Sequence, residues 1–254
     1  WTLRRNRTKM LAHGIRVSED QLPRVMKCVE RCSSKVPLDY QVDTFVVPNR
    51  ELSAFTFGEF KSRTLVLTSG LVEALDEDEL TSIIGHEWGH VALGHTLMGS
   101  LFSALTKGAF VTLRIAAATA AAQASTADQE EEKSQQKGGI SALTILSTLA
   151  LLLAPVVFAA YRRLSEISAD RVSVVVSGSA DKSVSALAKV VAGPELSNEL
   201  NEEALIAQAK EAQQSVYGRL QQLMGDHPFM GSRLKAIREW EETPEYNELQ
   251  TLVA

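Results

Sequence analysis

The chain has 254 residues, which is enough for one large domain or two small ones with a hydrophobic core. Its 26 lysines and arginines are outnumbered by 31 aspartates and glutamates, so the formal net charge is −5. That balance argues against a nucleic-acid-binding protein, which needs a basic surface to neutralise phosphates, and no nucleic-acid partner is expected. A hydrophobic content of 45% excludes a disordered chain, and 2 cysteines are too few for a disulfide scaffold.

The N-terminal residues combine Trp1 with the basic residues Arg4, Arg5 and Arg7. An interfacial aromatic residue followed by positive charges is typical of the cytosolic flank of a membrane helix. An ordinary solvated basic terminus fits the same residues equally well. Because the first residue is tryptophan and not methionine, we expect a processed chain or a fragment.

One helix and a small sheet are predicted for the first third of the chain. The helix is expected over 18–32, with Ser18 and Gln21 as a capping box. Three extended runs follow, rich in β-branched, aromatic and leucine residues and separated by turn residues, at 44–47, 54–57 and 64–67. We expect these runs to form a small antiparallel sheet.

A second helix is predicted to begin near Asp76, where Asp76 and Glu79 suit another capping box. This helix contains the sequence H-E-W-G-H, which matches the pattern H-E-x-x-H. Residues four apart share a helix face, so the imidazoles of His86 and His90 can bind one metal ion. Glu87, beside the first of them, can act as a general base on a metal-activated water.

A third metal ligand must come from elsewhere, since a catalytic zinc site has three protein ligands and an open position. The best candidate is Glu166, in the sequence S-E-I-S-A-D-R. Asp170 lies one helical turn later, where it can orient a ligand histidine. Taken alone, this carboxylate pair also fits a solvated acidic face. Its combination with H-E-x-x-H favours the interpretation of Glu166 as a ligand.

Two further histidines compete for a role. At 100° per residue, His95 would lie on the face of a continuous helix opposite to His86, so we expect it to be structural rather than a ligand. His227 lies in the sequence D-H-P-F. A histidine near the metal can donate a hydrogen bond to an oxyanion, although a surface turn is the default interpretation of a His-Pro pair.

The middle of the chain, residues 97–161, is predicted to form an apolar helical hairpin with a polar tip at 128–139. Residues 140–160 carry no charge and are long enough to cross a bilayer, whereas 97–127 contains Arg114. A spanning hairpin and an apolar face that packs on protein or lies in the interface both remain open. The expected ligands flank the hairpin and bind one ion, so the number of crossings must be even.

Three sequence blocks carry a family resemblance: H-E-W-G-H-V-A-L-G-H, S-E-I-S-A-D-R and D-H-P-F-x-x-x-R. Together they resemble the HtpX-type zinc metallopeptidases over about residues 18–240. This family belongs to the gluzincins, whose third zinc ligand is a glutamate. It is related to the type I CAAX prenyl endopeptidases and to bacterial quality-control metalloproteases.

The resemblance implies one Zn²⁺ per chain, with His86, His90 and Glu166 as ligands. Glu87 would be the general base, and Asp170 would be the carboxylate that orients a ligand.

The resemblance also assigns residues around this centre. His227 would stabilise the oxyanion, with Arg233 anchoring its loop. An edge strand would pair with substrate backbone through Ala54, Phe55, Thr56 and Phe57. Many family members carry asparagine where Ser53 stands, so a specific amide contact there is in doubt.

We therefore expect an α+β, mainly helical, zincin-like metallopeptidase domain with a small antiparallel sheet and an inserted apolar hairpin. One catalytic domain would comprise 1–96 and 162–254. Its expected reaction is the hydrolysis of extended, unfolded or membrane-derived polypeptides, as in protein quality control. The alternative is a non-catalytic, zinc-stabilised chaperone or membrane scaffold that holds unfolded chains.

The expected location is the membrane, with the active domain facing the cytoplasm. Arg162 and Arg163 directly follow the apolar segment, and the positive-inside rule places such residues on the cytoplasmic side. A periplasmic or peripheral location is the alternative. The sequence does not predict an oligomeric state.

Overall fold

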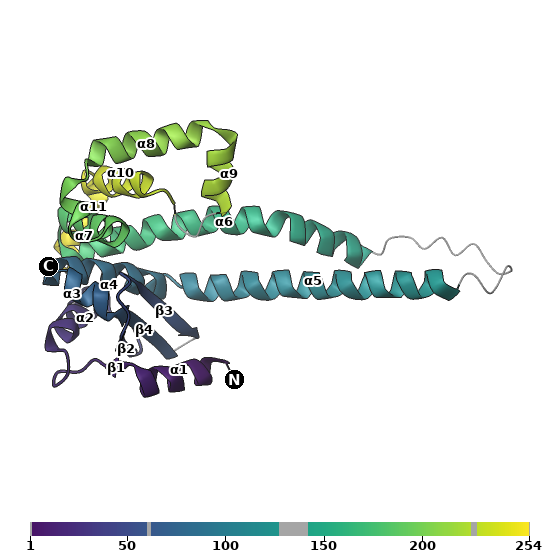
Figure 1. Ribbon diagram of the computed structural model, residues 1–254, viewed down its shortest axis with the longest axis horizontal. Helices are drawn as coiled ribbons and strands as arrows, with labels where there is room; N and C mark the ends of the chain where they lie inside the picture. Colours follow the sequence, from purple (N-terminus) through teal and green to yellow (C-terminus); the bar gives the residue numbers. More distant parts are fainter. Residues whose placement is uncertain (1, 60–61, 127–141, 225–227, 254) are drawn as a thin grey trace. The chain divides into compact units, whose positions relative to one another are not determined.

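The computed structural model describes residues 2–59, 62–126, 142–224 and 228–253 (Figure 1). Contacts divide the chain into two compact units. The first unit comprises Trp1–Leu97 and Arg162–Ala254, and the second comprises Met98–Tyr161. The described residues are mostly helical with one small sheet, which confirms the expected fold class.

The elements of the first unit come from both ends of the chain. Its N-terminal elements are α1 (Thr2–His13), β1 (Ile15–Arg16), α2 (Pro23–Lys35), β2 (Val42–Val47), β3 (Ala54–Glu59), β4 (Ser62–Thr68), α3 (Ser69–Ala74) and α4 (Glu77–Ala92). Its C-terminal elements are α7 (Ala180–Ala192), the 3-10 helix η2 (Leu196–Glu199), α8 (Glu202–Gln214), α9 (Val216–Met224), α10 (Met230–Glu241) and α11 (Pro244–Val253). Two long helices, α5 (His95–Thr126) and α6 (Ala142–Ser177), have residues in both units.

Helix α2 begins at Pro23 and not at the predicted Ser18. Proline suits the first turn of a helix but disfavours a helical conformation in the residue before it. Leu22 lies outside the right-handed helical region, with a φ of 62°, and Ser18 and Gln21 form an isolated antiparallel bridge instead of a capping box. The apolar face of α2 packs against α4 through Val25, Cys28, Val29 and Cys32.

The sheet has the order β1-β2-β4-β3 and is mixed, which corrects the wholly antiparallel sheet expected from the sequence. The pairs β1–β2 and β3–β4 are antiparallel, but β2 and β4 are parallel, with Phe45 opposite Val66. After β2, residues 48–53 carry the chain past the position that β4 later fills. Strand β4 then inserts between β2 and β3, so that β3 becomes an edge strand.

Helix α4 begins at the predicted capping box, which is confirmed. The Asp76 carboxylate accepts a hydrogen bond from the Glu79 backbone N–H (2.8 Å), and the Glu79 carboxylate accepts one from the Asp76 backbone N–H (2.9 Å). Two side chains of α7 also donate hydrogen bonds to the Glu79 carboxylate: the ammonium group of Lys189 at 2.8 Å and the hydroxyl of Ser185 at 2.7 Å. The start of α4 is therefore fixed both within the helix and to α7.

Close packing of α6 against α4 depends on Gly89. A β-carbon at this position would lie 3.0 Å from the β-carbon of Val172 and 3.1 Å from the α-carbon of Ala169. Both distances are tighter than ordinary van der Waals contact, so only glycine fits without displacement of α6. This approach brings the helix that carries Glu166 next to the helix that carries H-E-x-x-H.

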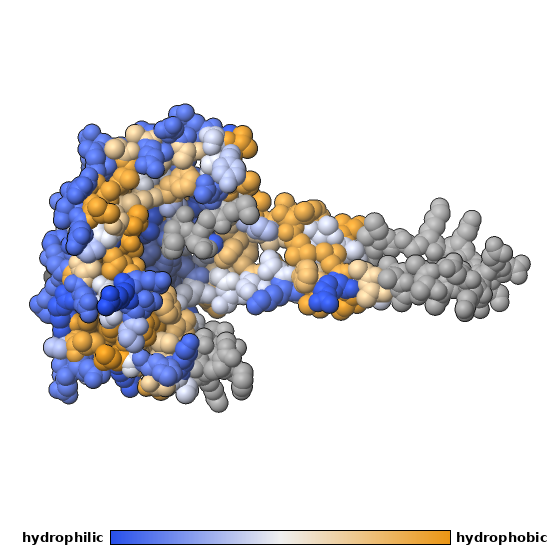
Figure 2. All heavy atoms as spheres, in the orientation of Figure 1, coloured by the Kyte–Doolittle hydropathy of each residue, from blue (hydrophilic) through white to orange (hydrophobic). Residues whose placement is uncertain are grey.

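Within the second unit, the aromatic ring of Phe102 on α5 contacts Phe158 and Tyr161 on α6, with ring centroids 5.0 and 6.1 Å apart. Large apolar side chains cover much of the visible surface of these two helices (Figure 2). Two stretches, His95–Thr119 and Thr144–Ser177, are long and apolar enough to cross a membrane by length and composition. The polar tip predicted at 128–139 lies outside the described residues.

Candidate metal centre

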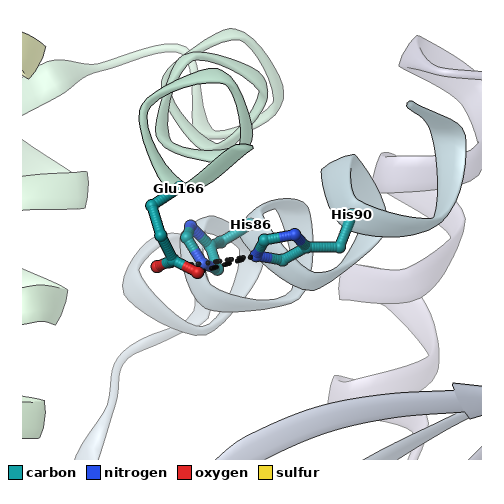
Figure 3. A group of neighbouring side chains, drawn as sticks. All are labelled: His86, His90 and Glu166. Atoms are coloured by element: carbon teal, nitrogen blue, oxygen red, sulfur yellow. Dashed lines mark hydrogen bonds and ion pairs between the residues drawn. The ribbon is translucent and has the colours of Figure 1, made fainter. Parts of the chain in front are cut away.

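His86 and His90 on α4 and Glu166 on α6 point their side chains at one another (Figure 3). The Nε2 atoms of His86 and His90 are 3.2 Å apart. The Glu166 carboxylate oxygens lie 3.4 Å from Nε2 of His90 and 3.6 Å from Nε2 of His86. His86 and Glu166 are buried, at 8% and 6% exposure. The three ligand atoms therefore converge on one point inside the protein.

This arrangement fits a zinc ion. Tetrahedral ligands at roughly 2.0–2.1 Å from zinc lie about 3.3–3.4 Å from one another. The two Nε2 atoms are 3.2 Å apart, and each lies near one Glu166 oxygen, Oε1 at 3.4 Å for His90 and Oε2 at 3.6 Å for His86, so the group has the size of a zinc site. Two imidazole nitrogens and a carboxylate are also ligands that zinc prefers. Because all three groups present electron pairs to the same point, they repel one another, and a cation between them would compensate that repulsion.

Asp170 sets the orientation of His86. Its Oδ1 lies 2.8 Å from Nδ1 of His86, and its two oxygens accept hydrogen bonds from Nε and Nη2 of Arg233, at 2.9 and 2.6 Å. Burial alone would raise the pKa of Asp170, but the adjacent guanidinium and the hydrogen bonds hold that pKa below its usual range. An ionised carboxylate only accepts, so Nδ1 of His86 carries the proton and Nε2 presents its lone pair to the metal.

The interpretation of His95 as lying on the far face of the helix is wrong. Helix α4 ends at Ala92, and Gly94 adopts a φ of 72°, so the chain turns before α5 begins at His95. Nδ1 of His95 consequently lies 3.0 Å from Nδ1 of His90. Burial and the neighbouring His90 lower the pKa of His95 to about 4.

The carboxylate of Glu87 lies beside the edge strand. Its Oε2 accepts a hydrogen bond of 3.2 Å from the hydroxyl of Thr56 on β3. Side chains alternate along a strand, so Phe55 and Phe57 point to the opposite face, where their rings stack with centroids 6.3 Å apart. The four predicted edge-strand residues do lie in the edge strand β3, and β3 contacts α4.

A pocket of about 440 Å³ lies beside His86 and Glu87. Its lining is largely apolar and includes Leu52, Ala54, Ile83, Leu187, Val190 and Met230. Arg233 supplies a charged group to the same pocket. A second pocket, of about 540 Å³, is lined mainly by α2, β2 and the residues between them, together with Arg16, Val17 and Trp88, and none of the three ligand candidates lines it.

The structure brings most of the predicted site residues together. The exception is His227, which the structure does not describe. The guanidinium of Arg233 binds Asp170, and its expected role as an anchor for the loop of His227 stays a prediction. Sequence reasoning did not identify Thr56 as a partner of Glu87 or His95 as a partner of His90. Gly94 was a usable signal for the latter, because glycine often follows the last turn of a helix.

Comparisons with known proteins find related sequences over most of the chain. Residues 18–241 match the sequence profile of Peptidase family M48. A protein named Protease HtpX homolog from Trichormus variabilis is 26% identical over 232 residues, which cover 89% of this chain and 76% of that relative. Protease HtpX from Shewanella loihica is 25% identical over 221 residues, which cover 84% and 71% of the two chains.

Two further matches cover a smaller share of the matched protein. A Protease HtpX homolog from Desulforapulum autotrophicum is 28% identical over 167 residues, covering 65% of this chain and 51% of the relative, so this chain spans about half the length of that protein. The crystal structure of S. mikatae Ste24p aligns with a TM-score of 0.49 and 17% identity, over 84% of this chain and 49% of that chain.

The family match extends from before α2 to the end of α10. It therefore includes every candidate ligand as well as Asp170 and Arg233. It confirms the resemblance to HtpX-type peptidases that the three sequence blocks indicated. The chain belongs to peptidase family M48.

Proposed function

We propose that this chain is a zinc-dependent metalloendopeptidase. The observation that carries the proposal is the convergence of His86, His90 and Glu166 next to the carboxylate of Glu87. Three protein ligands leave one coordination position open, which is typical of catalytic zinc sites and not of structural ones. Membership of peptidase family M48 supports the same reaction.

A zinc ion held by these three side chains would activate a water molecule and polarise a peptide carbonyl. Glu87 is proposed to take the proton of the attacking water and to deliver it to the leaving amine. Thr56 holds one oxygen of Glu87 by its hydrogen bond, which fixes the direction of the carboxylate. Asp170 and Arg233 keep His86 in the tautomer that can bind metal.

The proposed substrates are extended polypeptides. An edge strand recognises a peptide through main-chain hydrogen bonds, which only an unfolded or extended segment can offer. Strand β3 is such an edge and runs beside α4. The apolar pocket beside Glu87 suits an aliphatic or aromatic side chain of the substrate. Unfolded proteins or segments released from membranes have both properties.

Membrane association is a second part of the proposal, in which the 97–161 region is a hairpin inserted into one catalytic domain. The two apolar stretches on α5 and α6 support it by length and composition. Because the proposed ligands precede and follow the hairpin, both of its arms cross the bilayer or neither does. Co-flotation with liposomes tests this association, and a chain that remains soluble without detergent and ignores liposomes would contradict it.

Replacement of the proposed base separates hydrolysis from zinc-supported binding of unfolded chains without cleavage. Glu87→Gln keeps the size of the side chain but removes the proton acceptor, so zinc content should remain while casein cleavage is lost. Wild-type chain with and without a chelator is the control. Cleavage by a zinc-loaded Glu87→Gln variant would remove Glu87 as the base. Zinc-loaded wild-type chain that binds casein without cutting it would favour the non-catalytic alternative.

A further inference from the structure

The two candidate ligand histidines use their ring nitrogens in the same way. Each points Nε2 at the other and at Glu166, and each turns Nδ1 away from that point. Nδ1 of His86 meets Asp170 at 2.8 Å, and Nδ1 of His90 meets Nδ1 of His95 at 3.0 Å. The second contact has no counterpart in the expectations drawn from the sequence. We propose that His95 is a positioning residue that accepts a hydrogen bond from His90 and so holds it for metal binding.

Metal binding fixes the direction of this hydrogen bond. A histidine that gives the Nε2 lone pair to a metal carries its proton on Nδ1, so Nδ1 of His90 must donate. Nδ1 of His95 must then accept, and the proton of a neutral His95 is on Nε2. The inference rests on the proposed metal centre, since without a metal either nitrogen of His90 could be protonated.

The surroundings of His95 agree with this tautomer. Its Nε2 lies 3.4 Å from the hydroxyl of Ser168, a long and therefore weak hydrogen bond. That hydroxyl directs its own proton to the backbone carbonyl of Leu164 (2.9 Å) or of Ser165 (3.1 Å). Its oxygen therefore has lone pairs left to accept from Nε2–H of His95. The result is a directed chain of hydrogen bonds from His90 through His95 to α6.

The break between α4 and α5 makes this contact possible. In a continuous helix, His95 would be turned away from His90 by five steps of 100°, which is about 140° around the helix axis. The left-handed conformation of Gly94 ends α4, and the α5 helix then starts with His95 facing back toward His90. The rings meet edge to face, with centroids 5.1 Å apart and an interplanar angle of 72°.

Two substitutions at His95 distinguish a role as hydrogen-bond acceptor from a role in packing alone. In His95→Asn, the amide oxygen occupies about the position of Nδ1 and can accept from His90. In His95→Leu, a methyl group occupies it and leaves a partly buried N–H without an acceptor. His13→Leu makes the same replacement at an exposed histidine and is the matched control.

Zinc dissociation constants, measured by competition with a chromophoric chelator on the full chain in detergent, provide the readout. His95→Leu should weaken zinc binding about 10- to 100-fold, while His95→Asn and His13→Leu should stay within about threefold of wild type. Equal affinity of all four proteins, or equal loss in the Leu and Asn variants, would overturn the role of His95. A wild-type chain that takes up no zinc would overturn the metal centre itself, and this inference with it.

A measurement on the unaltered protein covers the case in which a variant fails to fold. In zinc-loaded wild-type chain labelled with ¹⁵N-histidine, His95 should show an unprotonated acceptor Nδ1 and a protonated Nε2. His90 should carry its proton on Nδ1. A proton on Nδ1 of His95 would overturn the proposal even if zinc is bound.

Discussion

Asp170 and Arg233 form a two-point ion pair behind His86, in which Nε and Nη2 of the guanidinium donate to the two carboxylate oxygens at 2.9 and 2.6 Å. Both side chains are largely buried, at 3% and 12% exposure. The pair joins α6 to α10, and it holds the carboxylate that orients the histidine. Stability and metal binding therefore depend on the same contact.

Asp170→Asn should damage both properties. The amide cannot accept both hydrogen bonds, and the buried charge of Arg233 keeps only the more distant Glu166 carboxylate, at 3.9 Å, which costs up to roughly 3–5 kcal/mol of unfolding free energy. Zinc affinity should fall by about 10- to 100-fold, because His86 is no longer held in one tautomer. Thermal unfolding and chelator competition measure the two effects.

Glu239→Gln on α10 is the control for that substitution, because it removes an exposed ion pair with Lys235 on the same helix. It should change the unfolding free energy by less than about 1 kcal/mol. Asp170→Asn protein that matches wild type in both stability and zinc affinity would contradict the account of this pair.

Gly89→Ala tests whether close helix packing builds the metal centre. The added methyl group would press on Val172 and Ala169 of α6, which overpacks the interface and costs roughly 1–3 kcal/mol of stability. Zinc affinity should fall as well, because α6 carries Glu166. Gly108→Ala on α5 has open space around it and should not lower zinc affinity. Unchanged stability and zinc affinity in Gly89→Ala would argue against this role of the glycine.

Thr56→Val tests the hydrogen bond to the proposed base. Valine has nearly the same shape as threonine, and the main chain of β3 stays able to pair with a peptide. A hydrogen bond to a carboxylate contributes about 1.5–3 kcal/mol. If it supports Glu87 in the transition state, its loss should lower kcat by about tenfold or more while KM changes little. Thr56→Ser should retain most activity. A normal kcat in Thr56→Val would show that Glu87 does not depend on this contact.

The apolar pocket beside Glu87 predicts a substrate preference. Peptides with a leucine, methionine or phenylalanine next to the scissile bond should be cut about tenfold faster, measured as kcat/KM, than the same peptides with aspartate there. Val190→Phe narrows the pocket and should penalise phenylalanine more than alanine at that position. No preference among these peptides, in either protein, would mean that this pocket does not contact the substrate.

Glu79 should contribute a pH dependence to stability. Burial would raise its pKa, but the hydrogen bonds from Lys189 and Ser185 outweigh burial and leave the pKa below its usual value. The folded state therefore prefers the ionised form. Ionised Glu79 stabilises the fold at every pH above the pKa that this carboxyl group has in the unfolded chain. This stabilisation is lost as the pH falls through the lower pKa that Glu79 has in the folded protein.

Thermal unfolding between pH 7 and pH 3 tests this for Glu79→Gln against wild type. The substitution should lower stability at pH 7, and the two proteins should converge at the acid end. A difference that stays constant across this range would show that the ionisation of Glu79 does not contribute.

The parts of the fold and site that could be predicted are those set by local spacing. The capping box of α4 and the shared face of His86 and His90 follow from residues within one or two turns of each other. Glu166 was singled out because a catalytic zinc needs a third ligand and the S-E-I-S-A-D-R sequence offered one. The structure brings its carboxylate next to both histidines.

The features that sequence reasoning missed depend on distant residues or on one special backbone angle. The parallel pairing of β2 with β4 depends on where β4 inserts, and extended runs alone do not encode that. His95 was misplaced because a steady 100° per residue cannot describe a chain that turns at Gly94. The start of α2 differs from the prediction because Pro23 suits the first turn of a helix, whereas Ser18 and Gln21 pair with each other as a bridge.

Zinc content together with X-ray absorption at the zinc edge tests the central claim most directly. Purified wild-type chain should hold one zinc ion with two imidazole nitrogens and one carboxylate as its only protein ligands. Glu166→Ala should lose most of that zinc while it stays folded. A chain without zinc affinity, or a zinc ion closed by four protein ligands, would contradict the account.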